Sequence, residues 1–442
     1  MACTESEEGG STLTKYSVFG KVVEEDGVGV PNVKVKLSSG TETFTDNKGR
    51  FSLSNVSGLL TLSVIQDNAT FSPSSIAVRP NMDSLVFTKQ RIGTSATKAP
   101  ELYTWLQSQQ MSNGLVRSSG LSTVVSLYDN ALAALVFTST KDYAKAEQIF
   151  SFFDGRISSE LTAGRGGFAQ FRNLNGQPSG NAWLGDNAWL LIALNAYELE
   201  KPNHNFGRLK SELVRWIKGL QQADGGLISG YEPNGNPLNF VVTEAMLDAF
   251  HAVPGYESFH TNCLKYLGNS RFDVASQNIV CDPSSARHRY ALDNFSWAYS
   301  MIPSFPASIL DRAEMFYTTK TATANNATVS GYCFDTDLDA VWPEGTLQMA
   351  LAYQIAGNNA KADLLLTEME KFVVPSTVNR NLLGIPYATN RTTHYGSSPL
   401  WQFSDTEPAV SSAAFYLFTA YRFNPYAVGR TKVIPQTDKF WN

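Results

Sequence analysis

YDNALAALVF, at residues 128–137, is the first of six apolar stretches that decide the fold of this 442-residue chain. The other five are GDNAWLLIALNAYEL (185–199), TEAMLDAFHAV (243–253), LDNFSWAYSMI (292–302), PEGTLQMALAYQIA (343–356) and EPAVSSAAFYLFTAYRF (407–423). Each stretch has the periodicity of a helix and carries an acid at its start. The six acids are Asp129, Asp186, Glu244, Asp293, Glu344 and Glu407. Successive acids are 49 to 63 residues apart, a spacing that fits a repeated two-helix hairpin.

A second kind of helix alternates with these stretches. It is amphipathic and charged, as in DYAKAEQIFSFF (142–153), LKSELVRWIKGLQQ (209–222), SILDRAEMFYTT (308–319) and NNAKADLLLTEMEKFV (358–373). A helix that is apolar all round is buried, and one with a polar face lies outside. Six inner helices with six outer partners predict an all-α (α/α)6 toroid over residues 101–427. ELYTWLQSQQ (101–110) is the outer helix expected to close the ring, and 428–442 is expected to be a C-terminal tail.

The chain before residue 91 has a different pattern. Apolar and polar residues alternate in YSVFGKVV (16–23), VKVKLSS (33–39) and LLTLSVI (59–65), with turn residues between them. Several short strands within residues 15–90 predict a small β-sandwich. The Gly-Val-Pro lead-in and the Thr45-Asp46-x-x-Gly49-x-Phe51 hairpin make residues 17–88 resemble the carboxypeptidase regulatory-like domain, which is immunoglobulin-like. The resemblance implies a spacer or docking module.

The expected organisation is therefore multi-domain. Residues 1–14 form a tether, 15–90 the β-sandwich, 91–100 a linker and 101–427 the toroid, which is the expected catalytic part. We expect a monomer.

Composition limits the partners. The net charge is −5 and the isoelectric point is near 5.7, so no basic surface is available for a nucleic acid. No run of about 18 apolar residues is present to span a membrane. A neutral substrate such as a glycan remains compatible. The sequence has no P-loop, dinucleotide fingerprint or serine elbow, so no cofactor is expected.

The N-terminus is typical of a bacterial lipoprotein whose signal has been replaced by a start codon. Met1-Ala2 is followed by Cys3 and then by the polar, acidic TESEEGGST (4–12). We expect lipid on Cys3, and hence a location on the outer-membrane surface or in the periplasm. Membrane contact is expected only through that lipid.

The other cysteines are Cys263, Cys281 and Cys333, and none belongs to a Cys-x-x-Cys pair. We expect buried thiols. A disulfide among them, and a metal site formed by Cys281, Cys333 and His394, are the alternatives. The alternating acids of FDTDLDAVWPEG (334–345) lack the Gly and the terminal Glu of a calcium loop. No metal is therefore expected.

The six acids allow two interpretations. An acid near a helix N-terminus offsets the helix dipole or caps free N–H groups. For any single acid, this structural role alone would explain its position. A closed ring, however, would bring all six to one rim and line it with carboxylates. Cleavage of a glycosidic bond needs two carboxyl groups, one protonated and one ionised. The rim would supply such pairs.

Long loops before the inner helices are rich in aromatic and amide side chains, which sugar rings need for stacking and hydrogen bonding. Packing against the rim is the alternative for each aromatic residue. The residues expected to bind substrate are Trp183, Tyr231, Trp342, Tyr387, His394, Trp401 and Asp335.

Several segments together make residues 101–427 resemble the bacterial six-hairpin glycosidase superfamily. They include SLYDNALAAL, GDNAWLLIAL, LQQADGG, TEAMLDAF, VWPEGTLQMALAY and FNPY. Many hydrolases of that superfamily invert configuration, with their acids at or just before inner-helix N-termini. By position, the resemblance implies catalytic roles for Asp129, Asp186, Glu244 and Glu344. We predict Glu244 as the general acid and Asp129 as the base, with Asp186 and Glu344 as substitutes.

Three further interpretations stay open. Asp248 lies four residues after Glu244, on the same helical face, and either keeps one carboxyl protonated by repulsion or serves as a hydrogen-bonding neighbour. A glycan-binding or scaffold protein would keep the aromatic loops without needing two catalytic carboxyls. A polysaccharide lyase would place His288 or His394 beside an arginine.

Overall fold

The computed structural model describes residues 15–24, 27–58, 60–66, 70–73, 75–80, 82, 84–90, 96–285, 288–391, 394–395 and 398–442. The chain divides into two compact units between positions 94 and 95, and each unit is described by itself. The predicted tether with Cys3, and the first half of the predicted linker, lie outside the described residues. Within the described part, no helix has both the length and the apolar character that crossing a bilayer requires.

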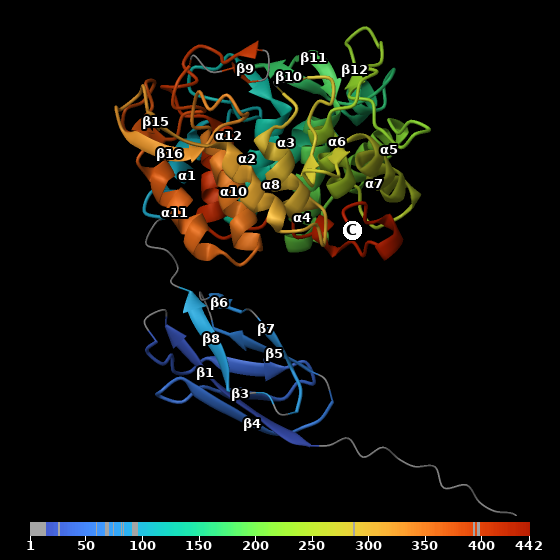
Figure 1. Ribbon diagram of the computed structural model, residues 1–442. Coiled ribbons are helices and arrows are strands. Elements are labelled where there is room, and N and C mark those ends of the chain that lie inside the picture. The colour runs from blue at the N-terminus through green and yellow to red at the C-terminus, as the bar shows by residue number, and fades with distance from the viewer. Residues whose placement is uncertain are drawn as a thin grey trace, which may run out of the picture. The chain divides into compact units, whose positions relative to one another are not determined.

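The first unit consists of two four-stranded sheets (Figure 1). One sheet has the order β4-β1-β8-β6 and the other β3-β2-β5-β7, with β1 and β8 paired in parallel. The strands are β1 (Tyr16–Glu24), β2 (Lys34–Leu37), β3 (Glu42–Phe44), β4 (Arg50–Val56), β5 (Leu60–Ile65), β6 (Thr70–Ser72), β7 (Ser75–Val78) and β8 (Leu85–Gln90).

Alternate side chains of both sheets enter one core, which includes Val18, Val22, Val35 and Leu53. This alternation is what a sheet with one buried face requires. The relationship to the carboxypeptidase regulatory-like domain stays a prediction.

The hairpin motif of this unit has a local explanation. The Oδ1 atom of Asp46 accepts hydrogen bonds from the backbone N–H groups of Lys48 and Arg50, both at 2.8 Å. Gly49 has φ +71°, and a Cβ there would lie 2.1 Å from the carbonyl oxygen of Val22. Only glycine therefore fits this turn between β3 and β4 without strain.

The second unit contains six inner helices, and each lies against the next in the ring. The contacts run from α2 to α4, α6, α8, α10 and α12, and α12 packs back on α2. The predicted ring of six hairpins is confirmed. The inner helices are α2 (Leu127–Ser139), α4 (Leu184–Glu200), α6 (Thr243–Ala252), α8 (Leu292–Met301), α10 (Pro343–Ile355) and α12 (Val410–Ala420).

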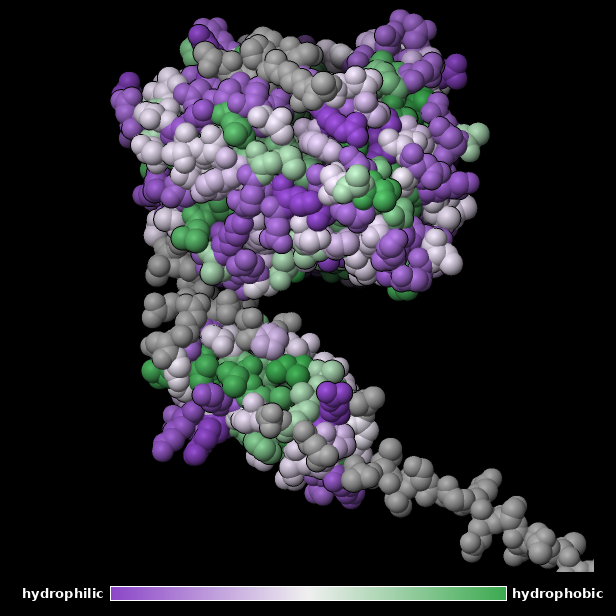
Figure 2. Space-filling model, in the orientation of Figure 1, coloured by the Kyte–Doolittle hydropathy of each residue, from purple (hydrophilic) through white to green (hydrophobic). Residues whose placement is uncertain are grey.

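The outer helices cover the ring, and α1 packs on α12, as expected for the helix that closes it. Polar side chains predominate on the visible face of this unit in Figure 2, with apolar ones in small groups. The outer helices are α1 (Ala99–Ser108), α3 (Tyr143–Asp154), α5 (Gly207–Gly219), α7 (Ser258–Ser270), α9 (Ser308–Arg312) and α11 (Asn359–Glu370).

The fifth outer helix is shorter than the sequence pattern predicted. α9 ends at Arg312, a 3-10 turn follows at Ala313–Phe316, and the chain then enters strand β15 (Tyr317–Thr321). β15 pairs with β16 (Thr328–Tyr332). The run YTTKT is rich in β-branched residues, which favour the strand over another helical turn.

Loops that precede the inner helices form small sheets at one end of the ring. A four-stranded sheet has the order β12-β11-β10-β9, and β9 and β11 lead directly into α2 and α4. Figure 1 shows this sheet at one end of the helical unit and the C-terminus at the other. Its strands are β9 (Val124–Ser126), β10 (Ala169–Asn173), β11 (Pro178–Trp183) and β12 (Gly230–Tyr231).

Residues 428–442, predicted to be a tail, are packed onto the ring. Arg430 donates hydrogen bonds to the carbonyl oxygens of Tyr299 and Ser300, at 2.7 and 3.0 Å. The ammonium group of Lys432 donates to the carbonyl oxygen of His251 at 2.8 Å. These carbonyls belong to the last turns of α6 and α8, whose free C=O groups need donors. The segment is therefore part of the helical unit.

Candidate active site

Five of the six acids lie inside the first turn of an inner helix, as its second or third residue. None of these five is the N-cap residue of its helix. Their position still favours a negative charge, because the helix dipole is positive at this end. The ring brings the five together with Asp248 from the second turn of α6. We call the six the carboxylate cluster: Asp129, Asp186, Glu244, Asp248, Asp293 and Glu344.

Two of the acids are each followed by an asparagine that fixes the neighbouring loop. Asn187 accepts a hydrogen bond from the N–H of Phe168 and donates to the carbonyl oxygens of Phe168 and Trp183, at 2.8 to 2.9 Å. Asn130 makes the same two-way pairing with the backbone of Val116. Each asparagine thus holds the preceding loop against the helix, and the aspartate beside it is left to face the cluster.

Burial raises the pKa of most members of the cluster. It raises the pKa of Asp129, Asp186 and Glu344 to about 7 and that of Asp293 to about 6. In each case the loss of hydration penalises the charged form. The negative charge of Asp129 further raises the pKa of both Asp186 and Glu344.

Glu244 and Asp293 form a carboxyl–carboxyl pair. Burial raises the pKa of Glu244 well above its usual range, and the charges of Asp293 and Asp248 and a hydrogen bond with Asp293 raise it further. Asp293 accepts hydrogen bonds from the backbone and side-chain N–H groups of Asn294, at 2.7 and 3.1 Å. These donors favour the ionised form of Asp293. The shared proton therefore resides on Glu244.

Asp248 is the deepest member of the cluster. Its side chain is fully buried, and neither carboxyl oxygen has a hydrogen-bond partner among the described residues. Burial, followed by the charge of Asp293, raises the pKa of Asp248 well above its usual range. A Cβ at Gly185 would lie 3.1 Å from the Oδ2 atom of Asp248, so the glycine leaves room for this carboxyl.

Glu344 and Glu407 have different surroundings. Glu344 accepts hydrogen bonds from the Tyr128 hydroxyl at 2.7 Å and the Gln348 amide at 3.3 Å, and stays in the cluster. Glu407 lies before α12 and accepts three hydrogen bonds from Ser376 and Thr377, at 2.7 to 2.8 Å. Glu407 is therefore a structural tie between two loops.

Aromatic side chains connect the cluster with the surface. Tyr387 is partly buried, and its pKa lies well above its usual range, chiefly because of lost hydration and further because of the charges of Glu344 and Glu244. The Tyr387 ring centre is 4.4 Å from that of Trp401, and Trp401 is 51% exposed. Trp342 lies 6.2 Å from Tyr387 but is buried. Trp401 thus offers a free ring face.

The remaining predicted binding residues are more scattered. Trp183 and Tyr231 are partly buried, with Trp183 beside the exposed Phe240 at 5.9 Å. Asp335 is buried, with its carboxylate 3.3 Å from His288, and its pKa is raised chiefly by burial and by its neighbours Asp337 and Asp339. The side chain of His394, in β19 (His394–Tyr395), lies outside the described side chains.

The arginine and tyrosine next to His288 are held by another residue. Arg289 and the Tyr290 hydroxyl both bind Asp273, at 3.3 and 3.1 Å. Arg287 lies outside the described residues. The contacts of Arg289 and Tyr290 thus give no support to the lyase interpretation.

The sequence pattern places Asp293 among the six acids, but Asp293 is not one of the four predicted catalytic residues. Its partnership with Glu244 depends on α6 and α8 being neighbours in the ring. The repeated Asp-Asn opening of LDNFSWAY was the available signal. The free thiols Cys263, Cys281 and Cys333 agree with the thiol interpretation.

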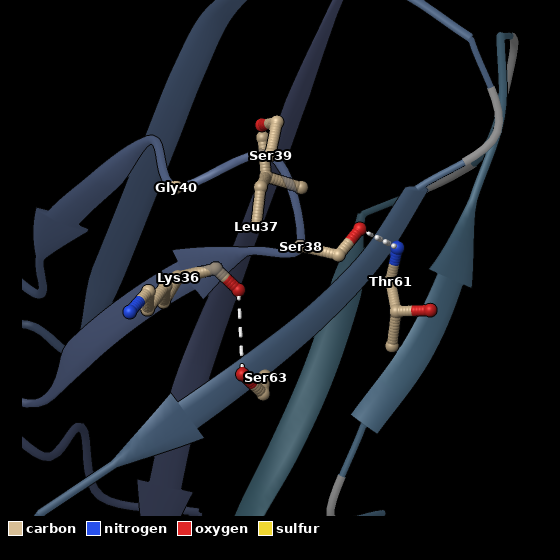
Figure 3. A pocket seen from close by; sticks show the side chains of 7 residues that line it. All are labelled: Lys36, Leu37, Ser38, Ser39, Gly40, Thr61 and Ser63. Atoms are coloured by element: carbon tan, nitrogen blue, oxygen red, sulfur yellow. Dashed lines mark hydrogen bonds between the residues drawn. The ribbon is translucent and has the colours of Figure 1, made fainter.

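A hollow of about 370 Å³ lies in the first unit (Figure 3). It lies over the β2–β3 turn and β5. Ser38 accepts a hydrogen bond from the N–H of Thr61 at 3.1 Å, and Ser63 donates to the carbonyl of Lys36 at 3.4 Å. The hollow is shallow and has no acid in its lining, so it does not resemble a catalytic site.

Comparison with solved structures identifies the architecture of the helical unit. A glycosidase variant in complex with glucose matches with a TM-score of 0.52 and 11% identity, over 76% of this chain and 97% of its own. A novel alpha-amylase from Clostridium perfringens matches at 0.50 with 8% identity, over 74% and 98%. A sugar epimerase from a ruminal bacterium matches at 0.50 with 10% identity, over 74% and 99%.

No family model matches the sequence, and no curated protein matches it significantly. The structural similarities, at this level of identity, establish the toroidal fold.

Proposed function

We propose that the helical unit is a glycoside hydrolase that acts on a poly- or oligosaccharide, with Glu244 as its general acid. The observation that carries the proposal is the Glu244–Asp293 pair within the buried carboxylate cluster. Such a pair keeps one carboxyl protonated near neutral pH, as a general acid requires. The similarity in fold to a glycosidase and an alpha-amylase supports a carbohydrate substrate.

Asp293 is too close to Glu244 to be the second catalytic carboxyl. The two carboxyls of a glycosidase are about 5 to 9.5 Å apart, whereas Asp293 shares a hydrogen bond with Glu244. We assign the base role to Asp129, which lies on α2, separated from α6 in the ring by α4 and therefore not in direct contact with Glu244 through neighbouring helices. Asp186 and Glu344 are the substitutes. Asp293 is then a positioning residue that keeps the proton on Glu244.

The exposed ring of Trp401, tilted by 53° against that of Tyr387, supports a substrate of more than one sugar unit. Tyr387 lies close enough to the cluster for the charges of its acids to raise the pKa of the Tyr387 hydroxyl, while Trp401 is in contact with solvent. A sugar bound at the cluster would therefore continue toward Trp401. Aromatic rings offer sugars a flat apolar face for this contact.

The test is a screen of the purified full chain against neutral and acidic polysaccharides, following reducing ends, unsaturated uronates and isomerised sugars. We expect reducing ends alone. Glu244→Gln and Asp129→Asn should each lower kcat by about 10²- to 10⁴-fold, the usual contribution of a general acid or base. The matched control is Glu101→Gln, an exposed acid in the first turn of an outer helix, which should keep full activity.

Other products would overturn the assignment. Unsaturated uronates would identify a lyase, and a changed sugar isomer would identify an epimerase. Binding without any product would identify a glycan-recognition protein. Full activity of Glu244→Gln would remove Glu244 from the mechanism.

We also propose that the chain is exported and anchored by a lipid on Cys3. The support is the Cys3 context followed by a polar, acidic segment. Radiolabelled palmitate should label the protein expressed behind a lipoprotein signal, and Cys3→Ala should abolish the labelling. Equal labelling of the Cys3→Ala variant would contradict the proposal.

A further inference from the structure

Two loops that lead into neighbouring inner helices bring together a second group of polar side chains, none of which belongs to the carboxylate cluster. The loop before α8 contributes His288, and the loop before α10 contributes Cys333, Asp335 and Asp337. The ligand atoms of Cys333, Asp335 and Asp337 all lie within 4.8 Å of one another. The Cys333 sulfur is 3.7 Å from the Oδ1 atom of Asp337. Thiolate, imidazole and carboxylate together are a zinc donor set.

One pair of atoms in this group is unusual. The Oδ2 atom of Asp335 is 3.3 Å from the Nδ1 atom of His288, and the Asp335 side chain is only 1% exposed. Despite this distance, neither atom has a hydrogen-bond partner among the described residues. The other oxygen of Asp335 accepts a hydrogen bond from the N–H of Asp337 at 3.2 Å, which fixes the carboxylate. The two atoms thus lie close together without a well-aligned hydrogen bond, and a third partner between them would satisfy both.

The spacing fits a tetrahedral ion. Zinc lies about 2.0 to 2.2 Å from nitrogen and oxygen ligands and about 2.3 Å from sulfur, so tetrahedral neighbours are about 3.3 to 3.6 Å apart. The Cys333–Asp337 distance of 3.7 Å comes close to these values, and the ligand atom of Asp335 lies within 4.8 Å of those of both residues. Calcium or magnesium would instead favour oxygen ligands only.

We propose that Cys333, Asp335 and Asp337 hold a zinc ion, and that His288, whose Nδ1 atom lies 3.3 Å from Asp335, turns toward the ion and ties the loop before α8 to the loop before α10. The site is structural, and it holds the two segments that lead into Asp293 and Glu344. The sequence suggested Cys333 as a metal ligand only as an alternative, together with Cys281 and His394. His288 precedes Cys333 by 45 residues, and only the fold brings the two loops together.

The test is a zinc titration of the full chain after removal of metals, in competition with a chromogenic chelator. We expect one zinc per chain. Cys333→Ser, Asp335→Asn and His288→Gln should each weaken binding by more than about 100-fold, since even outer partners of metal ligands are worth about 10- to 100-fold. Cys263→Ser is the matched control, a buried thiol outside the group, and should bind as the wild type does.

Cobalt provides a second measurement that does not depend on the variants folding. Cobalt(II) bound to the wild-type chain should show a thiolate charge-transfer band in the near ultraviolet. Absence of that band, less than one zinc per chain at micromolar zinc, or unchanged affinity in folded Cys333→Ser and Asp335→Asn variants would overturn the proposal. Zinc should also raise the Tm of the wild type and leave that of Asp335→Asn unchanged.

Discussion

At the scale of single residues, neighbours in the Asp-Asn openings have opposite roles. Asn187 satisfies the backbone of the loop before α4, whereas Asp186 is kept among other acids that it repels. The first arrangement stabilises the fold, and the second costs stability. Carboxyl groups held at raised pKa values in this way are typical of sites where proton transfer takes place.

This cost predicts a pH dependence of stability. Burial raises the pKa of Asp129 to about 7, and an unfolded aspartate has a pKa near 3.9. The folded state therefore binds the proton more tightly than the unfolded state. The stabilising contribution of Asp129 to the free energy of unfolding is fully present below about pH 4 and is lost as the pH rises toward 7. As the pH rises over that range, the free energy of unfolding of Asp129→Asn should increase relative to that of the wild type. The expected difference is a few kcal/mol, because each unit of pKa difference is worth about 1.4 kcal/mol.

The measurement is the free energy of unfolding by denaturant from pH 4 to 8, for the wild type, Asp129→Asn and the exposed control Glu101→Gln. Parallel curves for the wild type and Asp129→Asn would show that Asp129 is ionised normally in the folded protein.

At the scale of elements, the inner helices are constrained on every side. Nearly all of α10 is buried, and Gly345 in its first turn lies against the Trp342 indole. The outer helices need only one apolar face, which is why α9 could be shortened in favour of the β15–β16 hairpin without breaking the ring.

Gly345→Ala should destabilise the helical unit although alanine is the better helix former. A Cβ at this position would lie 2.1 Å from the Trp342 ring and 2.8 Å from Leu292. We expect a loss of about 1 to 3 kcal/mol from overpacking, which exceeds the gain of about 1 kcal/mol in helix propensity. Thermal unfolding checks this.

Gly207→Ala, at the start of the outer helix α5, is the matched control. A Cβ there meets nothing within 4 Å among the described atoms, so this change should be neutral or stabilising. Equal effects of the two substitutions would mean that packing around Gly345 is looser than described.

At the scale of the whole molecule, the last residues of the chain complete the end of the ring opposite the carboxylate cluster. Trp441 is buried, with its ring centre 5.0 Å from that of Phe305. The Asp438 carboxylate accepts hydrogen bonds from Tyr256 and Thr261. Residues that follow the sixth hairpin are therefore needed for the stability of the earlier ones.

Trp441→Ala should lower the free energy of unfolding by about 3 to 5 kcal/mol, as expected for a buried tryptophan. Val433→Ala, in the same segment at an exposed side chain, should change it by less than about 0.5 kcal/mol. Denaturant unfolding distinguishes the two. A small effect of Trp441→Ala would indicate that the segment detaches readily.

Much of this arrangement could be predicted from the sequence, because burial leaves a periodic pattern. The all-apolar stretches indicated the inner helices, and their acids indicated a cluster. The pairing of Glu244 with Asp293 could not be predicted, since both acids follow the same local rule and only the ring makes α6 and α8 neighbours. Glu407 follows that rule too, yet Ser376 and Thr377 bind it. The packed C-terminal segment escaped prediction because its partners, some of them backbone carbonyls of α6 and α8, lie far away in the sequence.

The contact between α1 and α12 sets an order of events during synthesis. A ribosome makes α1 more than 300 residues before it completes α12, so the ring cannot close until nearly the whole chain has emerged. During that time the apolar sides of α1 and α2 lack their final partner, and such surfaces aggregate unless they are protected. Closure of so long a loop is also slow. The nascent chain should therefore depend on chaperones until its last helix arrives.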